Sequence, residues 1–296
     1  MTHDILRYAA FTGDPAGGNP AGVVLDAAGL DEAEMLRIAA EVGYSETAFL
    51  TRAPEGGEGA FAVRYFSPLA EVPFCGHATV AAAVALAERG APGELTFRTR
   101  AGAVPVAVSA TDGAPSATLT SVPPYQEPVD PADLAEALAA LDWAAGDLDP
   151  ELPPRIAFAG ARHLVLGAGT RERLARLDYD AERLAALMRR LDLTTVHLAW
   201  RESPAVHHVR NAFPVGGVAE DPATGAAAAA YGGYLRSLGL AAPPDVLTLH
   251  QGHDLGRPAL LTVTLSADAP GVRVRGTAVA IPSGGRDQDR DEGPAA

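Results

Sequence analysis

Apolar residues in this chain recur mostly at every second position, in short runs separated by turns rich in glycine and proline. A period of two is typical of half-buried strands. The pattern predicts strands at residues 5–11, 21–25, 46–51, 60–66, 94–98, 104–108, 116–119, 155–158, 163–166, 195–200, 245–250, 259–265 and 272–281. The close spacing of these runs favours antiparallel pairing over βαβ alternation.

Helical patterns interrupt the strands in two forms. Residues 30–42 carry apolar side chains at helical spacing with acids on the far side, and helices are also predicted at 131–141 and 181–191. Residues 80–86 and 226–235 differ, because these alanine-rich runs are apolar all round. Such helices are buried on every side, and small side chains suit a helix enclosed by a curved sheet.

The two alanine-rich runs belong to a repeated pattern of strand, glycine-bearing turn and helix. One copy starts at Val63-Arg64 and the other at Val209-Arg210, so the two arginines lie 146 positions apart (210 − 64) in a chain of 296. This spacing indicates a duplicated domain. The predicted fold class is α+β, with two pseudo-symmetric domains, each a curved antiparallel sheet or barrel around a central alanine-rich helix.

The pattern breaks around the proline-rich segment 123–128, where we place the boundary between the halves. The predicted domains are 1–122 and 123–281, each with its own glycine turn and central helix. Residues 282–296 are polar and rich in glycine and aspartate, and we predict a disordered tail.

Composition narrows the possible functions. The net charge of −14, from 23 basic and 37 acidic residues, argues against a nucleic-acid partner. No apolar stretch is long enough for a membrane span and the start has no signal-peptide pattern, so a cytoplasmic protein is expected. The chain has no lysine, which excludes a pyridoxal phosphate Schiff base, and a single cysteine excludes intrachain disulfides and two-thiol chemistry.

The glycine turns are candidate anion sites, since the first N–H groups of a helix are unpaired and lie at the positive end of its dipole. Facing each other, Gly76-His77-Ala78 and Thr224-Gly225-Ala226 would hold a small carboxylate. Ordinary helix starts are the alternative interpretation. Two matched copies favour the binding site.

Three polar residues could carry the chemistry. Glu46 opens an apolar strand, where desolvation suits a carboxyl to act as acid and base; a solvated strand end is the alternative. Asp221 precedes a proline, a pattern equally compatible with a helix N-cap and with catalysis. His77 lies in the first helical turn, whose dipole disfavours a positive imidazole.

Other histidines and Asn19 have simpler explanations. His250 and His253 have a spacing seen in metal sites, but no third ligand is evident, so no metal site is predicted. His207 and His208 are interpreted as strand surface. Asn19 before Pro20 is a common way to start a turn.

Five ordered segments resemble the PhzF-like phenazine-biosynthesis isomerase family, across roughly residues 5–281. They are Gly18-Asn19-Pro20, residues 45–49 (SETAF), 71–79 (EVPFCGHAT), 220–225 (EDPATG), and Gln251-Gly252 with Gly256-Arg257-Pro258. That family shares the diaminopimelate epimerase-type fold, needs no cofactor and is commonly dimeric. The resemblance therefore implies a cofactor-free homodimer that acts on a small carboxylate substrate.

The resemblance also implies roles for residues of this chain. Glu46 would be the proton-shuttling acid/base, with His77 and Asp221 completing the catalytic site. The predicted substrate-binding residues, apart from those three, are Asn19, Gly76, Thr224, Gly225 and Ala226. One departure concerns Ala226, because the phenazine enzyme has a serine there, so the phenazine substrate itself is in doubt.

Related epimerases and proline racemases use a pair of cysteines, one from each half. Cys75 occupies the first position, but its counterpart is Pro222 by motif or Thr224 by glycine alignment, and neither is a thiol. Cys75 is accordingly predicted to be a small buried residue. We expect a proton-moving isomerase; an epimerase or racemase using Glu46 with another base, and a non-catalytic carboxylate-binding protein, are the alternatives.

Overall fold

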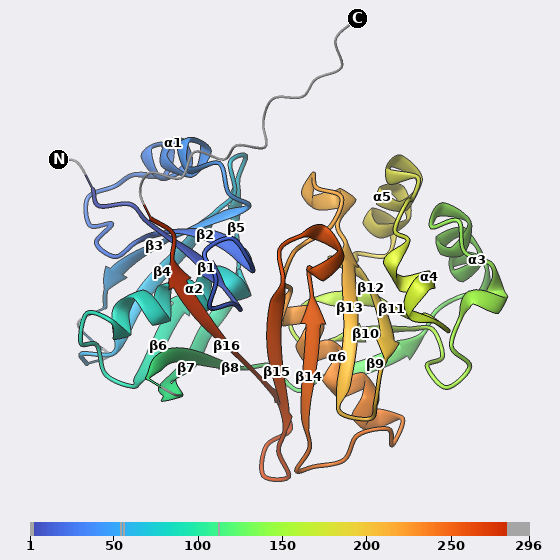
Figure 1. The fold of residues 1–296 in the computed structure, drawn as a ribbon. Coiled ribbons are helices and arrows are strands. Elements are labelled where there is room, and N and C mark those ends of the chain that lie inside the picture. Colours follow the sequence, from blue (N-terminus) through green and yellow to red (C-terminus); the bar gives the residue numbers. More distant parts are fainter. Residues whose placement is uncertain (1–2, 54, 56, 112, 283–296) are drawn as a thin grey trace, which may run out of the picture.

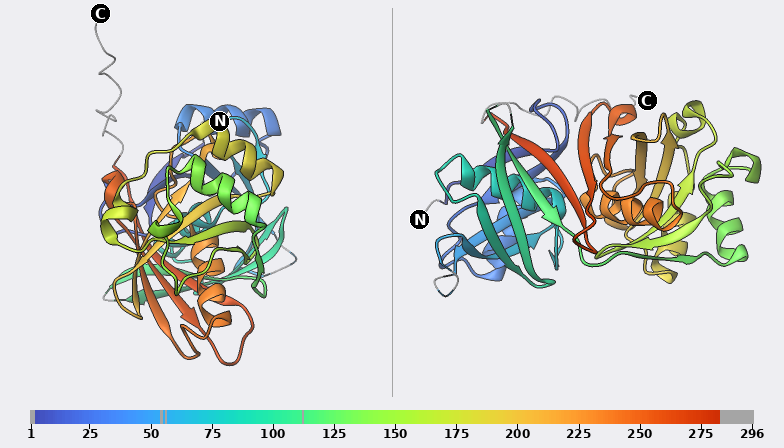
Figure 2. Two further views of the ribbon diagram at one scale, coloured as in Figure 1. Left: turned by 90° about the vertical axis from the view of Figure 1, so that its right-hand side faces the viewer. Right: turned by 90° about the horizontal axis from the view of Figure 1, so that it is seen from below.

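The chain forms two barrel-like halves that lie side by side, each with a helix at its centre (Figures 1 and 2). The structure, a computed structural model, describes residues 3–53, 55, 57–111 and 113–282. The predicted tail 282–296 lies outside the described residues except for Pro282. Within the described part of the chain, no helix is long and apolar enough to cross a membrane.

The first half runs from β1 to β8. Its elements are β1 (Leu6–Ala10), β2 (Asn19–Val24), α1 (Glu32–Val42), β3 (Glu46–Arg52), β4 (Ala60–Phe66), β5 (Glu71–Val72), α2 (Gly76–Ala87), β6 (Glu94–Thr99), β7 (Gly102–Thr111) and β8 (Ala114–Thr120).

The second half repeats this order after an additional strand and helix. Its elements are β9 (Tyr125–Pro128), α3 (Pro131–Ala140), β10 (Arg155–Phe158), β11 (Arg162–Gly167), α4 (Arg171–Ala175), α5 (Ala181–Arg190), β12 (Thr195–Arg201), β13 (Val206–Ala212), α6 (Gly225–Ser237), β14 (Val246–Gln251), β15 (Ala259–Leu265) and β16 (Val272–Ala280). Strand β9 lies within the segment 123–128, where the sequence pattern placed the boundary and no strand.

Strand pairing shows the duplication directly. The neighbours β1-β2-β3-β4-β6-β7-β8 in one half correspond to β10-β11-β12-β13-β14-β15-β16 in the other. Helix α2 occupies the same place between β4 and β6 as α6 does between β13 and β14. The mixed α+β fold with a barrel-like sheet and two similar halves is the one that the sequence predicted.

The prediction of purely antiparallel sheets was wrong. Four neighbouring pairs are parallel: β2 with β3, β4 with β6, β11 with β12, and β13 with β14. Each of these pairs is joined through at least one helix, because parallel neighbours require a crossover from one end of the sheet to the other. The helical runs between the strands supply those crossovers.

The last strand of the chain pairs with strands of both halves. Strand β16 pairs with β15 of its own half, and also with β8 and β1 of the first. Strand β8 continues through a short loop into β9, which pairs with β10. In Figure 1 the dark red β16 crosses from one half to the other. The predicted strand 272–281 therefore closes both sheets, whereas the sequence placed it in the second alone.

Both central helices are enclosed, as predicted from their composition. Residues 77–86 of α2 are all buried, and α6 is buried along most of its length. A Cβ on Gly232 would lie 2.7 Å from Val263 Cγ1, and a Cβ on Gly233 would lie 2.5 Å from Pro124 Cβ. The sheet packs so closely around α6 that only the smallest side chains fit at these two positions.

Phe11 joins the halves at the point where β16 crosses. Its backbone N–H donates to the Thr277 carbonyl at 2.7 Å, and its carbonyl accepts from the Leu260 N–H at 2.8 Å. Its φ of 64° is unusual for a non-glycine residue. A Cβ on Gly276 would lie 2.2 Å from Phe11 Cδ1, so this glycine makes room for the ring.

Gly276→Val should destabilise the protein by about 3 kcal/mol, because the new side chain must displace the Phe11 ring from a packed interface. Urea-induced unfolding monitored by circular dichroism measures the change. Gly13→Ala is the matched control, since a Cβ there meets no atom within 4 Å. An equal effect of the two substitutions would contradict the packing role of Gly276.

Candidate active site at the meeting of the central helices

The N-termini of α2 and α6 meet between the two halves. A Cβ on Gly76 would lie 3.9 Å from Gly225 Cα and 4.0 Å from the Ala226 nitrogen. The N-cap residues are Cys75 and Thr224, and neither side chain caps its helix. The predicted convergence of the glycine turns is therefore present, and two positive helix ends face one small region.

Glu46, Cys75 and His77 form a compact cluster beside the tip of α2. His77 Nε2 lies 3.5 Å from Glu46 Oε2, and the Cys75 thiol donates to the same oxygen with Sγ at 3.6 Å. Only 16 % of the Glu46 side chain and 6 % of the His77 side chain meet solvent. The alternative of a solvated strand-end glutamate is therefore wrong: Glu46 is the first residue of β3 and lies against the first turn of α2.

Cys75 is buried, as the sequence predicted. Burial raises the pKa of its thiol well above the ordinary value, and the nearby negative charge of Glu46 raises it further. The cysteine is thus held as a neutral thiol between a carboxylate and an imidazole.

Asp221 lies beneath the tip of α6, bound to residues of both halves. Its Oδ1 accepts from Asn19 Nδ2 at 2.7 Å, and its Oδ2 accepts from the Thr224 hydroxyl at 2.5 Å. Burial raises the pKa of this carboxyl to about 6. Helix α6 begins at Gly225 with Thr224 as its N-cap, so the interpretation of Asp221 as an N-cap before a helical proline is wrong.

Asn19 connects the two catalytic candidates that come from different halves. Besides Asp221, its Nδ2 lies 3.1 Å from the Ala223 carbonyl oxygen and 3.2 Å from His77 Nδ1. Because an amide nitrogen can only donate, the neutral His77 ring accepts at Nδ1 and carries its proton on Nε2. That proton faces Glu46 Oε2 and Ser45 Oγ, which lies 3.4 Å from Nε2.

Replacing Asn19 should raise the pKa of Asp221 above its present value of about 6, since the amide stabilises the ionised carboxylate. Asn19→Ala should also cost about 1–3 kcal/mol of unfolding free energy, because buried acceptors lose their donor. A carbon-13 NMR titration of the Asp221 carboxyl tests the shift. Thr224→Val should shift it the same way, and Ser67→Ala, whose hydroxyl bonds only within its own turn, should leave it unchanged. An unmoved titration in Asn19→Ala would contradict the contact.

Two residues of the site were quoted in the sequence only as parts of motifs. Gln251 Oε1 accepts from the Thr224 N–H at 3.1 Å, and its Nε2 donates to the Asp221 carbonyl at 2.7 Å. Arg257 donates to the carbonyls of Gly17 and Gly18, each at 2.9 Å. Their place in a segment that resembles the family, 251–258, was the only signal in the sequence. Their partners lie in distant turns that come near only when the chain folds.

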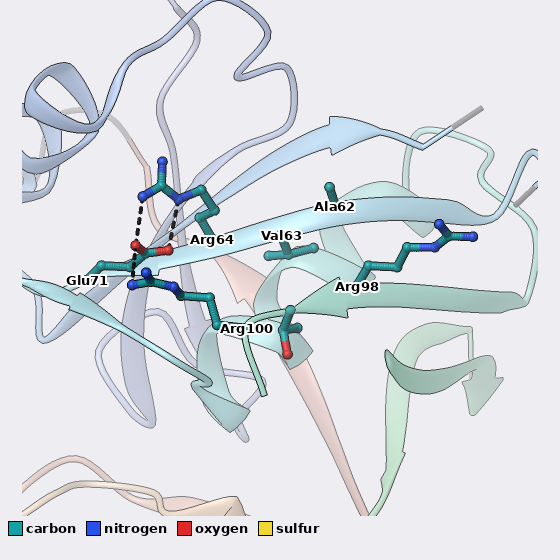
Figure 3. Close-up of a pocket in the computed structure, with 7 residues that line it drawn as sticks. Ala62, Val63, Arg64, Glu71, Arg98 and Arg100 are labelled. Atoms are coloured by element: carbon teal, nitrogen blue, oxygen red, sulfur yellow. Dashed lines mark hydrogen bonds and ion pairs between the residues drawn. The ribbon is translucent and has the colours of Figure 1, made fainter. Parts of the chain in front are cut away.

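The repeated arginines also have matching contacts. Arg64 Nε donates to Glu71 Oε1 at 2.8 Å, and Arg210 Nε donates to Glu220 Oε2 at 2.7 Å. Glu71 lies on β5 and Glu220 forms a β-bridge with Ala212, and each precedes a glycine turn. Each ion pair therefore fixes the segment before its glycine turn to the preceding strand. Arg100 also contacts Glu71, at 2.7 Å (Figure 3). A recess of about 350 Å³ lies beside this cluster, and none of the residues that line it belongs to the two helix tips.

Two clusters contain metal-ligand types. The donor atoms of Glu46, Cys75 and His77 lie within 4.8 Å of one another. On β13, His208 lies beside His250 with ring centroids 5.0 Å apart, and His253 is 5.3 Å from His250. His208 is a third imidazole that the sequence did not reveal. Its neighbour His207 is buried against Tyr231, which corrects its assignment to the strand surface.

The sequence of this chain is similar to those of several known proteins. The family model described as PhzC-PhzF, phenazine biosynthesis-like protein, matches residues 8–284. An uncharacterized isomerase of Bacillus subtilis, YfhB, is 31% identical over 287 residues, covering 94% of this chain and 96% of its own. A trans-2,3-dihydro-3-hydroxyanthranilate isomerase of Pseudomonas fluorescens is 29% identical over 266 residues, covering 88% of this chain and 89% of its own.

Solved structures agree with the sequence comparisons. A PhzF-family phenazine biosynthesis protein of Bacillus anthracis superposes with a TM-score of 0.84 at 29% identity, covering 95% of this chain and 98% of that one. A probable proline racemase of Agrobacterium radiobacter shares the fold, with a TM-score of 0.63 at 15% identity, covering 94% of this chain and 91% of that one. The predicted relation to the epimerase-type fold is confirmed.

Proposed function

Because this chain belongs to the PhzC-PhzF, phenazine biosynthesis-like family, whose named relatives are isomerases, we propose that it is a cofactor-independent isomerase. The reaction is the transfer of a proton between two positions of a small carboxylate-bearing substrate. The observation that carries the proposal is the place of Glu46, which lies beside His77 and Cys75 where the central helices meet.

The substrate carboxylate binds between the two helix tips in this proposal. Backbone N–H groups at Gly76 and Gly225, together with their neighbours, donate to its oxygens from opposite halves. Negative charge that develops on the substrate during proton removal is stabilised by the same donors, which are fixed before the reaction begins. Since Ala226 contributes through its backbone, its side chain is not needed for this contact.

Glu46 takes the proton from one carbon and returns it to another. Its carboxylate is mostly shielded from solvent, so the abstracted proton is retained for the second step. The His77 Nε2–H stabilises the carboxylate before the transfer and orients it. Asp221, through Asn19, holds the imidazole in the tautomer that directs this proton to Glu46.

We further propose that the substrate differs from that of the Pseudomonas fluorescens relative. Ala226 stands where the phenazine enzyme has serine, so a hydroxyl donor is missing. The sequence-based expectations of a homodimer and of a cytoplasmic location belong to this proposal; size-exclusion chromatography with light scattering tests the first.

An epimerase or racemase is the second candidate, favoured by the fold shared with the proline racemase. The single cysteine argues against a two-thiol mechanism, because Cys75 has no second thiol to act on the opposite face. A second base would have to come from the remaining polar groups. Asp221 is the closest chemical candidate, with its pKa of about 6.

Proton exchange in deuterated water tests the proposal. A panel of small carboxylates, saturated and conjugated, is incubated with the protein and followed by proton NMR. Deuterium at a new carbon together with a shifted double bond supports the isomerase. Deuterium at a single inverted centre supports the epimerase instead. A ligand that binds tightly with no exchange at any pH would refute both and leave a carboxylate-binding protein.

A further inference from the structure

Cys75 has no part in the proposed proton transfer, yet it lies within the group that carries it. Its Sγ is 3.6 Å from Glu46 Oε2 and 3.9 Å from His77 Nε2. The third side of this triangle, Nε2 to Oε2, measures 3.5 Å. A thiol, an imidazole and a carboxylate thus meet at one point, and each is a common ligand of zinc.

The triangle has the size that a tetrahedral ion requires. Zinc bonds of about 2.3 Å to sulfur and about 2.0–2.2 Å to nitrogen and oxygen place such ligands roughly 3.3–3.6 Å apart. The measured separations of 3.5, 3.6 and 3.9 Å lie within about 0.4 Å of that range. Sγ also lies 3.3 Å from His77 Nδ1, so the Cys75 side chain must turn about its Cα–Cβ bond toward Nε2 to complete the geometry. The backbone of β3 and α2 already holds the three residues together.

Charge and burial favour a cation at this point. The carboxylate of Glu46 is 3.6 Å from the Cys75 sulfur, and that of Asp221 is linked to His77 through Asn19. A divalent ion would replace the thiol proton and offset these charges. The surroundings are sparsely solvated, since Cys75 is 7 % exposed and His77 is 5 % exposed.

We propose that Glu46 Oε2, Cys75 Sγ and His77 Nε2 bind one thiophilic divalent ion, Zn²⁺ above all, and that this ion inhibits the enzyme. Three protein ligands leave one position open for water or for the substrate carboxylate. A thiolate with an imidazole selects zinc or cobalt over magnesium and calcium. Inhibition follows because the bound ion occupies the carboxylate that transfers the proton. Only this last step rests on the proposed function; the binding does not.

The surface histidines His208, His250 and His253 are the competing place for a metal. Their rings lie 5.0–6.4 Å apart, close enough for weak binding of the same ions. They offer no sulfur, however. A probe that reports a sulfur ligand therefore separates the two places.

Cobalt binding to the full chain, freed of metal with a chelator, provides that probe. Titration with Co²⁺ should produce the sulfur-to-cobalt charge-transfer band with one equivalent, and Zn²⁺ should abolish it by displacement. Cys75→Ser should lose the band and bind Zn²⁺ roughly 100-fold more weakly, as measured by calorimetry. The double variant His250→Ala and His253→Ala should keep the band at full intensity.

Circular dichroism and thermal unfolding show whether Cys75→Ser is folded, and Cys75→Ala is the second variant if it is not. Absence of the band from the wild-type protein, or equal zinc affinity in the cysteine variants, overturns the site and assigns binding to the surface histidines. If the charge-transfer band forms but no carboxylate is turned over, the proposed isomerase activity is refuted and the metal site is supported. Turnover that persists at saturating Zn²⁺ overturns the inhibition.

Discussion

Glu46→Gln should lower the rate of proton transfer by about 10³-fold while leaving substrate affinity within a few-fold of the wild type. The amide keeps the size of the side chain and can still contact His77, but it cannot accept and return a proton. Turnover on a substrate found by deuterium exchange gives the rate, and calorimetry gives the affinity. A loss of kcat with an unchanged dissociation constant is the pattern of a group needed in the transition state.

Glu41→Gln is the matched control for this substitution. Glu41 is the same residue type on the exposed face of α1, where it pairs with Arg37. It should retain full activity. Undiminished turnover in Glu46→Gln would remove Glu46 from the mechanism, and an equal loss in both variants would point to a nonspecific effect.

Acidification should unfold the protein well before its carboxylates are fully protonated. The second half contains three buried histidines: His163, His197 and His207. Burial lowers their pKa values to about 3, about 4 and about 4, respectively. Each is neutral in the folded chain at a pH where the unfolded chain would already be charged.

The hydrogen bonds explain why two of these histidines stay neutral. His197 Nδ1 contacts Asn211 Oδ1 at 3.1 Å, and the Thr195 hydroxyl donates to the same oxygen at 2.8 Å. Thr195 Oγ1 must then accept from His163 Nδ1, also at 2.8 Å. Both rings carry their proton on Nδ1, and among the described residues neither Nε2 has a partner. A second proton would be buried without an acceptor.

The sign of the effect follows from these lowered pKa values. The unfolded histidines bind protons below about pH 6.5 and the folded ones do not, so stability is full above that pH and falls below it. At about pH 4.5 the loss is roughly 8 kcal/mol for the three histidines. The raised pKa of Asp221 opposes it by about 2 kcal/mol, which leaves about 6 kcal/mol. Such a loss is comparable with the whole stability of an ordinary protein.

Urea unfolding between about pH 7 and about pH 5 checks this expectation. The quantity to compare is the slope of the unfolding free energy against pH. His163→Gln should reduce the slope by about one proton, because one buried imidazole is gone. An unfolding free energy that is constant over this range would contradict the burial argument.

Local sequence patterns predicted most elements of the fold. The helix expected at 30–42 is present as α1, with Asp31 as its N-cap and Gly43 ending it in the left-handed region at φ 73°. The two alanine-rich runs are the central helices α2 and α6. These features can be predicted locally, because the spacing of apolar residues within a helix or strand determines which face it buries.

Parts of the candidate site were also visible in the sequence. The matched glycine turns indicated that two helix starts would converge, and the structure brings them together. The family resemblance singled out Glu46, His77, Asp221 and Asn19, which the structure places in one hydrogen-bonded region. The catalytic roles of the first three and the substrate-binding role of Asn19 remain predictions.

Other features depended on contacts between distant residues. Strand register on β13 and β14 brings His208 to His250, and the last residue of β14, Gln251, contacts Thr224. No local pattern contains these distances.

The sequence by itself determined the secondary elements, the duplication and the family, since each follows from the spacing or identity of neighbouring residues. Tertiary structure alone decided which strands run parallel, that β16 pairs with strands of both halves, and that Asp221 binds Asn19 instead of capping a helix. A barrel closes when its last strand pairs with an unpaired strand edge. Here β16 of the second half pairs with β1 and β8 of the first half. That pairing joins residues more than two hundred positions apart, and it sets where the catalytic candidates meet.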